Sequence, residues 1–446
     1  MVDLDAIVLA TEPSSRVRVA GLSARERATR VASKFGATRV FVVESSEQLR
    51  DLAAWRAVRS QPLLVVRANQ LVHTGLVQPL IEAMPRDGVV LAVVPDAPAV
   101  GDLTVGSYAG AFVAAGRAAD EVVATLVASD VADDNAIVAK FPTATRVPHG
   151  AIARAPLETK AQIREAHRVL YRILIKPQDN AITRYLYRPV SFPLTRLLVW
   201  TPITPNQISY FVAALVALGL WVTASASFGR ALLGTVIILI ASYIDCCDGE
   251  VARVKLLSSR FGAWVDTVVD ELSSVGYMVA IGWHCHLNFG PGWFGSLHAN
   301  LGVDPWKAAI VIGTVTILGS IYCIYYNIIV AVGSANSQDY VGRFEVVPGK
   351  QPNSVRLVPA VQKAIAPRQP LPWPLEIVAT YGPYIVRRDF ISWLAVILAA
   401  THLTHLAFGL LVAGGVLTSV VLTIDHVKLR SLRRSIERRG MLLEAP

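Results

Sequence analysis

The second half of the chain consists of long apolar segments that are interrupted by four aspartates. Asp245 and Asp248 follow one apolar run, and Asp266 and Asp270 lie in the next. An aspartate at the centre of a membrane helix costs roughly 2.5–3.5 kcal/mol. Four carboxylates in one segment require a compensating positive charge, which a bound divalent cation supplies. The pattern therefore predicts a metal site inside a bundle of membrane helices.

The spacing of the aspartates is helical. Asp245 and Asp248 are three residues apart, and Asp266 and Asp270 are four apart, so each pair projects from one face of a helix. Two facing helices would bring all four carboxylates together. Small residues accompany them where backbones or a ligand must come close, namely Gly249, Ala252 and Gly262.

Composition divides the chain into a soluble part and a polytopic membrane part. Of the 446 residues, 53% are hydrophobic and only 17% are charged, and the membrane half contains long stretches without charge. The apolar runs predict six membrane helices, at residues 208–228, 231–244, 262–283, 308–332, 390–401 and 406–424.

The distribution of Lys and Arg predicts the orientation in the membrane. Basic residues lie between the second and third predicted helices, between the fourth and fifth, and after the sixth. The positive-inside rule then places both termini in the cytoplasm. We expect an integral multi-pass protein of the cell (inner) membrane. Contact with anionic lipid headgroups accounts for the net charge of +9, so we expect no nucleic-acid partner.

The first 155 residues alternate short β-branched runs with helical patterns, as at residues 6–10, 39–43, 62–66 and 89–94. This rhythm predicts a Rossmann-like α/β domain with a mostly parallel sheet and helices on both faces. We expect this domain to be cytosolic. A linker with juxtamembrane amphipathic helices should follow at 156–200, and a six-helix membrane domain at 201–440.

The order D-x2-D-G-x2-A-R-x8-G-x3-D-x3-D, from Asp245 to Asp270, resembles the motif of the CDP-alcohol phosphotransferase (CDP-alcohol phosphatidyltransferase) superfamily, with every fixed position filled. The sequence TPNQIS at 204–209 is similar to the start of that family's first membrane helix. Residues 176–179 and 188–191 resemble the amphipathic helix of members that are fused to a soluble domain. The resemblance covers roughly residues 176–440, with its diagnostic part at about 204–270.

The resemblance implies metal-dependent transfer of a substituted phosphate from a CDP-alcohol (CDP-diacylglycerol or a CDP-polyol) to an acceptor alcohol, with release of CMP. Such a reaction belongs to phospholipid or polyol-phosphodiester biosynthesis. The implied ligands of two Mg²⁺ (or Mn²⁺) ions are Asp245, Asp248, Asp266 and Asp270. Asp270 would also be the general base. The expected partners are the two substrates, membrane lipid and a second copy of the chain in a homodimer.

The resemblance also implies contacts with the cytidine diphosphate of the donor. The positions concerned are Asn206, Gln207, Ile208, Ser209, Gly249, Ala252, Arg253 and Ser259. Helix-end capping is an equal alternative for Gln207 and Ser259. If the acceptor carries a phosphate, Arg343, Arg387 or Arg388 could bind it, although a solvated positive-inside role also accounts for these arginines.

The first domain resembles nucleotidyltransferases that activate sugars or inositol phosphate. In those enzymes a Gly-rich loop follows the first strand, and a metal-binding Asp ends a later one. Here the loop at 11–18 has no glycine and contains Glu12 and Pro13, and the later position reads Arg67-Ala-Asn69. Proline has no N–H to offer a phosphate, and glutamate repels it. We interpret the domain as degenerate, with a role in packing, oligomerisation or regulation.

Two further classes of protein remain open. The same carboxylates could serve a membrane ion-binding or transport protein, or a catalytically silent scaffold. Metal binding through sulfur or imidazole is a further possibility, although hard oxygen ligands suit Mg²⁺ better. The residues concerned are Cys246, Cys247, and His284, Cys285 and His286 with His298.

Overall fold

The computed structural model describes residues 3–96, 104–129, 133–175, 181–290, 302–333, 339–349, 351, 353–359 and 388–444. The chain forms two compact units, which are not divided at a single point in the sequence. The first contains Met1–Asp179 with Phe192–Ile203 and Glu250–Leu257, and the second contains Asn180–Ser191, Thr204–Gly249 and Ser258–Pro446. Two short segments from the membrane half of the sequence therefore belong to the first unit.

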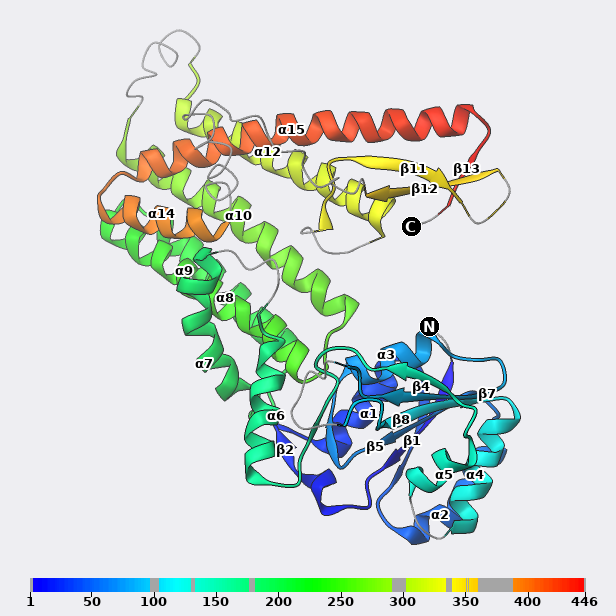
Figure 1. Ribbon diagram of the computed structural model, residues 1–446. Coiled ribbons are helices and arrows are strands. Elements are labelled where there is room, and N and C mark those ends of the chain that lie inside the picture. The colour runs from blue at the N-terminus through cyan, green and yellow to red at the C-terminus, as the bar shows by residue number, and fades with distance from the viewer. Residues whose placement is uncertain are drawn as a thin grey trace. The chain divides into compact units, whose positions relative to one another are not determined.

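The first unit is built on a six-stranded sheet in the order β4-β1-β5-β8-β7-β9 (Figure 1). Its strands are β1 (Leu4–Leu9), β4 (Ala37–Val43), β5 (Leu63–Arg67), β7 (Gly88–Val93), β8 (Tyr108–Ala115) and β9 (Thr145–Pro148). Only β8 runs antiparallel to its neighbours in this sheet. The predicted α/β domain with a mostly parallel sheet is thus confirmed. Short ribbons pair β2 (Arg18–Val19) with β3 (Leu22–Ser23), and β6 (Gln70–Val72) with β10 (Arg154–Pro156).

Helices cover both faces of this sheet, as the buried apolar strands require. α1 (Ala24–Lys34) and α3 (Thr74–Glu82) contribute to the hydrophobic core on one face. On the other face the core is formed by α2 (Leu49–Ala57), α4 (Arg117–Ser129) and α5 (Asp134–Lys140). α6 (Lys160–Arg172) follows, and single turns lie at η1 (Pro13–Arg16) and η2 (Ser46–Gln48).

The described residues of the rest of the chain are mainly helical. Its helices are η3 (Thr183–Tyr187), α7 (Arg188–Leu198), α8 (Pro205–Thr223), α9 (Phe228–Val254), α10 (Arg260–Asn288), α12 (Pro305–Asn327) with its continuation η5 (Ile328–Val332), α14 (Arg388–Ala400) and α15 (Thr404–Arg438). The strands β11 (Phe344–Pro348), β12 (Ser354–Pro359) and β13 (Leu442–Leu443) form a small sheet.

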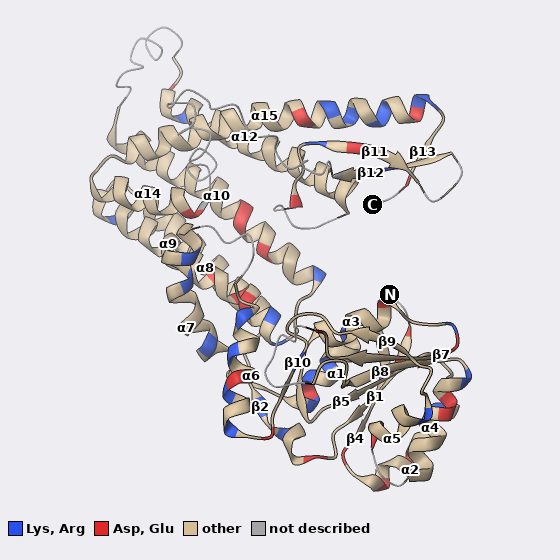
Figure 2. Ribbon diagram, in the orientation of Figure 1, with Lys and Arg blue, Asp and Glu red and all other residues tan. Residues whose placement is uncertain are grey.

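Four helices of the described chain are long and apolar enough to cross a membrane: α8, α9, α12 with η5, and α15. Each of the six predicted spans overlaps a helix, but the number six is not confirmed. α10 has 29 residues and carries Asp266, Asp270 and Glu271, whereas α14 has only 13 residues. The protein is a multi-pass membrane protein, and Lys and Arg gather along the C-terminal part of α15 (Figure 2).

The membrane helices approach each other closely at glycines. A Cβ atom at Gly234 of α9 would lie 2.5 Å from the carbonyl oxygen of Gly219 on α8. Glycine at both positions therefore lets the two backbones touch, as small residues do in membrane bundles. α10 packs against α8, α12 and α15. The helix that carries Asp266 thus lies among the other helices of the second unit.

Candidate metal centre

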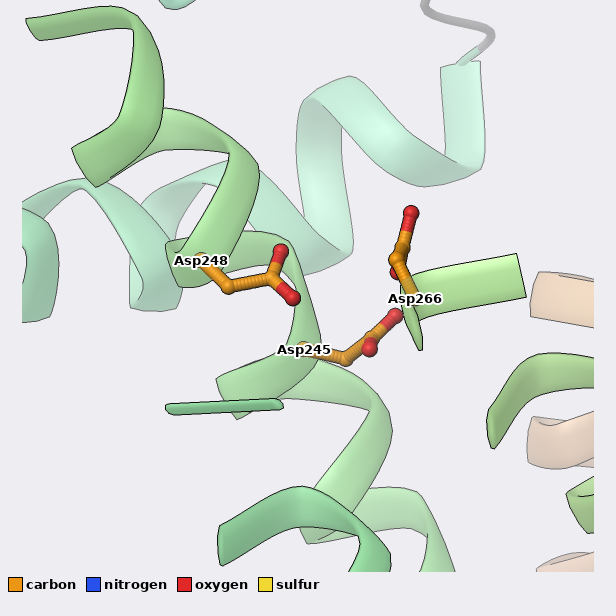
Figure 3. Close-up of side chains that lie close together, drawn as sticks. All are labelled: Asp245, Asp248 and Asp266. Carbon is orange, nitrogen blue, oxygen red and sulfur yellow. The ribbon is translucent and has the colours of Figure 1, made fainter. Parts of the chain in front are cut away.

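The carboxylates of Asp245 and Asp248, from α9, converge with that of Asp266, from α10 (Figure 3). One oxygen atom from each residue lies within 4.8 Å of one oxygen of each of the others. Three hard oxygen donors at this separation fit the ligand preference of Mg²⁺ or Mn²⁺. The i, i+3 spacing on α9 explains why its two aspartates share a face.

Asp248 is the most enclosed of the three aspartates, with 6% of its surface exposed. The hydroxyl of Ser209, which is buried on α8, donates a 2.6 Å hydrogen bond to Oδ2 of Asp248. Such a bond fixes the orientation of a carboxylate that binds metal. Ser209 was predicted to contact the donor substrate, and the structure places it beside a candidate metal ligand.

Replacing Ser209 by alanine should weaken metal binding. Removal of an outer-shell partner typically costs about 10- to 100-fold in metal affinity, and we expect about tenfold for Ser209→Ala. Titration with Mn²⁺, followed by the electron paramagnetic resonance signal of the free ion, measures the affinity. Ser242→Ala is the matched control, because the Ser242 hydroxyl donates to the backbone oxygen of Ile238 on the same helix. Equal affinity in the two variants would contradict the assigned role of Ser209.

Asp270 is not part of the three-carboxylate cluster. It lies one turn beyond Asp266 on α10, and its backbone oxygen accepts hydrogen bonds from the hydroxyls of Ser273 and Ser274, at 2.7 and 3.0 Å. The geometry thus distinguishes Asp270 from the other three aspartates. Its predicted part as a metal ligand and base stays a prediction.

Two predicted substrate-contact residues cap helices in this structure. Thr204 and Gln207 form a capping box at the start of α8, where the Thr204 amide donates to the Gln207 side chain at 2.9 Å. The hydroxyl of Ser259 accepts a hydrogen bond from the Gly262 amide at 2.9 Å and so caps α10. These bonds satisfy amides that helix ends leave without partners, and they favour the capping alternative for both residues.

The starts of α8 and α10 lie side by side. A Cβ atom at Gly262 would lie 3.0 Å from Oδ1 of Asn206 and 3.1 Å from Oγ of Ser259. A side chain at this motif position would require Asn206 and Ser259 to shift by a few tenths of an ångström. Ile208 is buried on α8, and Gly249, Ala252 and Arg253 continue α9 past the metal ligands.

Glu250 is a buried acidic residue that the sequence analysis did not single out. It has no exposed surface, and its Oε2 accepts a 2.6 Å hydrogen bond from the hydroxyl of Thr195 on α7. The only signal in the sequence is its place, one residue after the motif glycine. A buried carboxylate must be hydrogen-bonded, and Thr195 is a partner distant in sequence.

In the first unit, a turn fills the place of the expected phosphate loop. η1 follows β1, and the amides of Ser15 and Val17 donate to the carbonyls of Glu12 and Ser14 within the turn. The buried Ser15 hydroxyl donates to the Ala10 carbonyl at 2.9 Å. Amides that are engaged in this way cannot converge on a phosphate, which agrees with the degenerate interpretation.

At the end of β5 an arginine stands near the expected metal position. Arg67 pairs with Asp134 at 2.5 Å, and the hydroxyl of Tyr108 donates to the same carboxylate at 2.8 Å. Burial lowers the pKa of Arg67, but the hydrogen bond and the charge of Asp134 outweigh burial and raise it. The Asp134 carboxylate is therefore paired with a guanidinium group that stays positively charged.

We expect the first domain to make no nucleotide product. Full-length protein incubated with CTP and sugar phosphates or inositol phosphate should release no pyrophosphate, because the segment after β1 forms a hydrogen-bonded turn and Asp134 is paired with Arg67. The Asp245→Ala variant is the control, since it removes any contribution from the membrane domain. A CDP-polyol formed by that variant would show that the first domain is an active nucleotidyltransferase.

Sulfur and imidazole ligands do not join the metal cluster. Among the described residues, the three aspartates form the one group of at least three His, Cys, Asp or Glu side chains close enough to share a metal. The thiols of Cys246 and Cys247 donate to the carbonyls of Ser242 and Tyr243 on the same helix. The side chain of His284 contacts the Ser225 carbonyl at 2.5 Å. His298, like residues 176–179 and Arg387, lies outside the described residues.

Arg343, a candidate for binding an acceptor phosphate, lines a pocket of about 380 Å³ beside α15. The other lining residues are Gly342, Phe344, Asp425, Lys428, Leu429 and Leu432. Arg343 and Lys428 give the pocket two cationic groups, and Asp425, which pairs with Lys428 at 3.7 Å, gives it one carboxylate. The side chain of Arg388 is outside the described part of the chain.

Residues 202–349 match the family model of the CDP-alcohol phosphatidyltransferases. The chain is also similar to the "bifunctional IPC transferase and DIPP synthase" of Aquifex aeolicus, with 31% identity over 162 residues, which is 36% of this chain and 34% of the relative. Proteins of the same name from Rubrobacter xylanophilus and Archaeoglobus fulgidus are each 32% identical, over 123 and 129 residues. These matches cover 27% and 28% of this chain, and 28% and 25% of the relatives. The chain thus spans about a third or less of the length of these relatives.

Proposed function

We propose that this chain, whose residues 202–349 match the family model of the CDP-alcohol phosphatidyltransferases, transfers a substituted phosphate group from a CDP-alcohol to an acceptor alcohol and releases CMP. The observation that carries the proposal is the convergence of Asp245, Asp248 and Asp266 within the segment that matches the family. The match to the family and the similar proteins named as transferases support this proposal, which includes the activity, the substrates and the metal requirement.

The three converging aspartates would hold Mg²⁺ or Mn²⁺, with two ions expected. Divalent ions neutralise the charge of the pyrophosphate and of the departing CMP. Ser209 orients Asp248 through its hydrogen bond. Gly249 has no side chain and leaves room for the donor beside the cluster, and Arg253 offers a two-pronged hydrogen-bond donor to a phosphate.

Asp270 would act on the acceptor. Its carboxylate would take the proton of the acceptor hydroxyl while the hydroxyl oxygen bonds to the phosphorus that carries the donor's alcohol. The bond from that phosphorus to the CMP oxygen breaks in the same step. The position of Asp270 outside the three-carboxylate cluster supports a role different from that of the other aspartates.

We propose a polyol phosphate as the acceptor. The order of the domains resembles that of family members that use inositol phosphate, and the relatives are named for IPC transferase and DIPP synthase. In the pocket that Arg343 shares with the paired Lys428 and Asp425, the guanidinium of Arg343 would bind a phosphate on the acceptor. A lipid donor, CDP-diacylglycerol, and a soluble donor, a CDP-polyol, both fit a site on membrane helices.

The proposal is tested by CMP release. Purified protein in lipid is incubated with Mg²⁺, a labelled CDP-alcohol and a panel of acceptors that includes matched polyols with and without phosphate. We expect CMP only when a suitable pair is present, loss of activity with EDTA, and recovery with Mg²⁺ or Mn²⁺. Absence of CMP with every pair would contradict transferase function, and equal rates with phosphorylated and free polyols would contradict the acceptor assignment.

An ion-binding or transport protein is the alternative for the same carboxylates. Transport would require acidic residues along a pathway, but the apolar segments 208–228, 308–332 and 390–401 contain neither Asp nor Glu. Cation flux into liposomes that contain the protein, without CMP release, would favour this alternative.

We also propose that the chain crosses the cell membrane six times, with both termini in the cytoplasm, and that two copies form a homodimer. α10 and α14 would be the two additional spans. α10 carries charged residues, which a membrane accommodates if α8, α12 and α15, the helices that α10 contacts, shield them. α14 is short, with 13 residues. Labelling of single introduced cysteines from each side of the membrane tests the topology.

A further inference from the structure

The segment that joins the two metal-binding helices is held by the soluble domain. α9 carries Asp245 and Asp248, α10 carries Asp266, and residues 255–259 connect them. Although Glu250–Leu257 comes from the membrane half of the sequence, it belongs to the first compact unit together with the α/β domain. The contacts inside this unit therefore bear on the geometry of the metal centre.

Two arginines of α1 bind the end of α9. Arg27 is fully buried, and its guanidinium donates to the carbonyl of Val254 at 2.7 Å and to that of Val19 at 3.1 Å. One turn along the same helix, Arg30 donates to the carbonyl of Lys255 at 2.8 Å. Cations at a helix C-terminus satisfy its last carbonyls and are favoured by the helix dipole.

Other carbonyls at this helix end are satisfied within the chain itself. The amides of Lys255, Leu256 and Leu257 donate to the carbonyls of Val251, Arg253 and Ala252. Leu256 takes a left-handed backbone conformation, with φ of 57°, which a leucine adopts only when its surroundings hold it there. Its side chain is buried in the core cluster to which α1 and α3 contribute. The turn after α9 is thus fastened by a side chain as well as by hydrogen bonds.

Lys255 connects this anchor to the start of α8. Its ammonium group donates to the carbonyls of Thr201, at 2.6 Å, and Ile203, at 3.2 Å. Thr204, the capping residue of α8, follows directly, and Ser209 of that helix bonds to Asp248. The same helix end is therefore tied to the segment that leads into α8.

We propose that the soluble α/β domain positions the metal centre, with Arg27 and Arg30 holding the connection between α9 and α10 and thereby the separation of Asp248 from Asp266. Val254 lies six residues, about 9 Å, beyond Asp248 along α9. A helix transmits a displacement of its end over this length as a rigid body. The proposal rests on the proposed function for the identity of the metal centre, and it assigns a use to a domain in which a turn follows β1 where a phosphate loop was expected.

The test uses the full-length protein in lipid nanodiscs and three variants of α1. Arg30→Ala removes the bond to Lys255, and Arg27→Lys keeps the charge but cannot reproduce the fork to Val254 and Val19. Arg25→Ala is the matched control, because Arg25 is an arginine of the same helix that pairs with Glu44 at 2.5 Å. Backbone amide exchange of residues 250–262 measures the anchor, and Mn²⁺ titration measures the metal centre without requiring turnover.

We expect faster amide exchange at residues 250–262 and an affinity for Mn²⁺ weakened by about tenfold in Arg30→Ala and Arg27→Lys, the low end of the range for outer-shell partners. Arg25→Ala should match the wild type in both measurements. Because a purely structural role would not change metal affinity in a folded variant, unchanged Mn²⁺ affinity in Arg30→Ala would overturn the proposal. Unchanged amide exchange at residues 250–262 in Arg30→Ala would overturn the anchor itself.

The outcome for the wild type separates the two proposals. Wild-type protein that binds no Mn²⁺ would contradict the metal centre of the proposed function, and the exchange measurement would still decide whether α1 anchors α9. Wild-type protein that binds Mn²⁺ with the same affinity as a loosened Arg30→Ala variant would leave the proposed function intact and reject the positioning role.

Discussion

Asp245→Ala and Asp266→Ala should each lower the rate of CMP release by about 10³-fold. Metal ions contribute several kcal/mol of charge stabilisation, and each tenfold in rate corresponds to about 1.4 kcal/mol. The two residues lie on different helices, yet their carboxylate oxygens are within 4.8 Å of each other. Removing either one therefore takes a ligand from the same site. CMP release and Mn²⁺ titration are measured on each purified variant.

Asp304→Asn is the matched control for these variants. Asp304 caps α12 by accepting hydrogen bonds from the amides of Trp306 and Lys307, and asparagine caps equally well. Wild-type activity in this control shows that the loss is specific to the cluster. Full activity in either Asp245→Ala or Asp266→Ala would exclude the proposed metal centre.

Asp270→Asn should reduce turnover far more than it reduces binding. The change keeps the shape and one oxygen atom but removes the basic group, and general-base catalysis contributes roughly 10²- to 10⁴-fold. Because Asp270 is not part of the three-carboxylate cluster, Mn²⁺ affinity should remain close to that of the wild type. Single-turnover CMP release and equilibrium binding of the CDP-alcohol are the two measurements.

The comparison with Asp266→Asn gives this prediction its control. Asp266 lies one turn earlier on the same helix, and its replacement should weaken metal binding and turnover together. If Asp270→Asn also lost both in equal measure, Asp270 would be chiefly a metal ligand, and the proton acceptor would have to be sought elsewhere.

The sequence predicted the elements with strong local patterns. The β-branched runs at 6–10 and 62–66 became β1 and β5 because a strand buried on both faces is mostly apolar. The apolar runs became helices, and the match of residues 202–349 to the family confirmed the resemblance carried by the motif. The same patterns do not fix the number of spans, because α10 combines the length of a membrane helix with the charges of a metal site.

By itself, the sequence determined which residues could form the metal centre, since the i, i+3 and i, i+4 spacings are properties of single helices. The tertiary structure decided that three of the four aspartates converge, and that Glu250 meets Thr195. It also decided that Arg27 reaches Val254, 227 residues away. On a helix with many charged neighbours, Arg27 has the pattern of a solvated residue. A contact between two such distant segments leaves no periodic pattern in the sequence of either segment, because the contact depends on how the folded elements pack against each other.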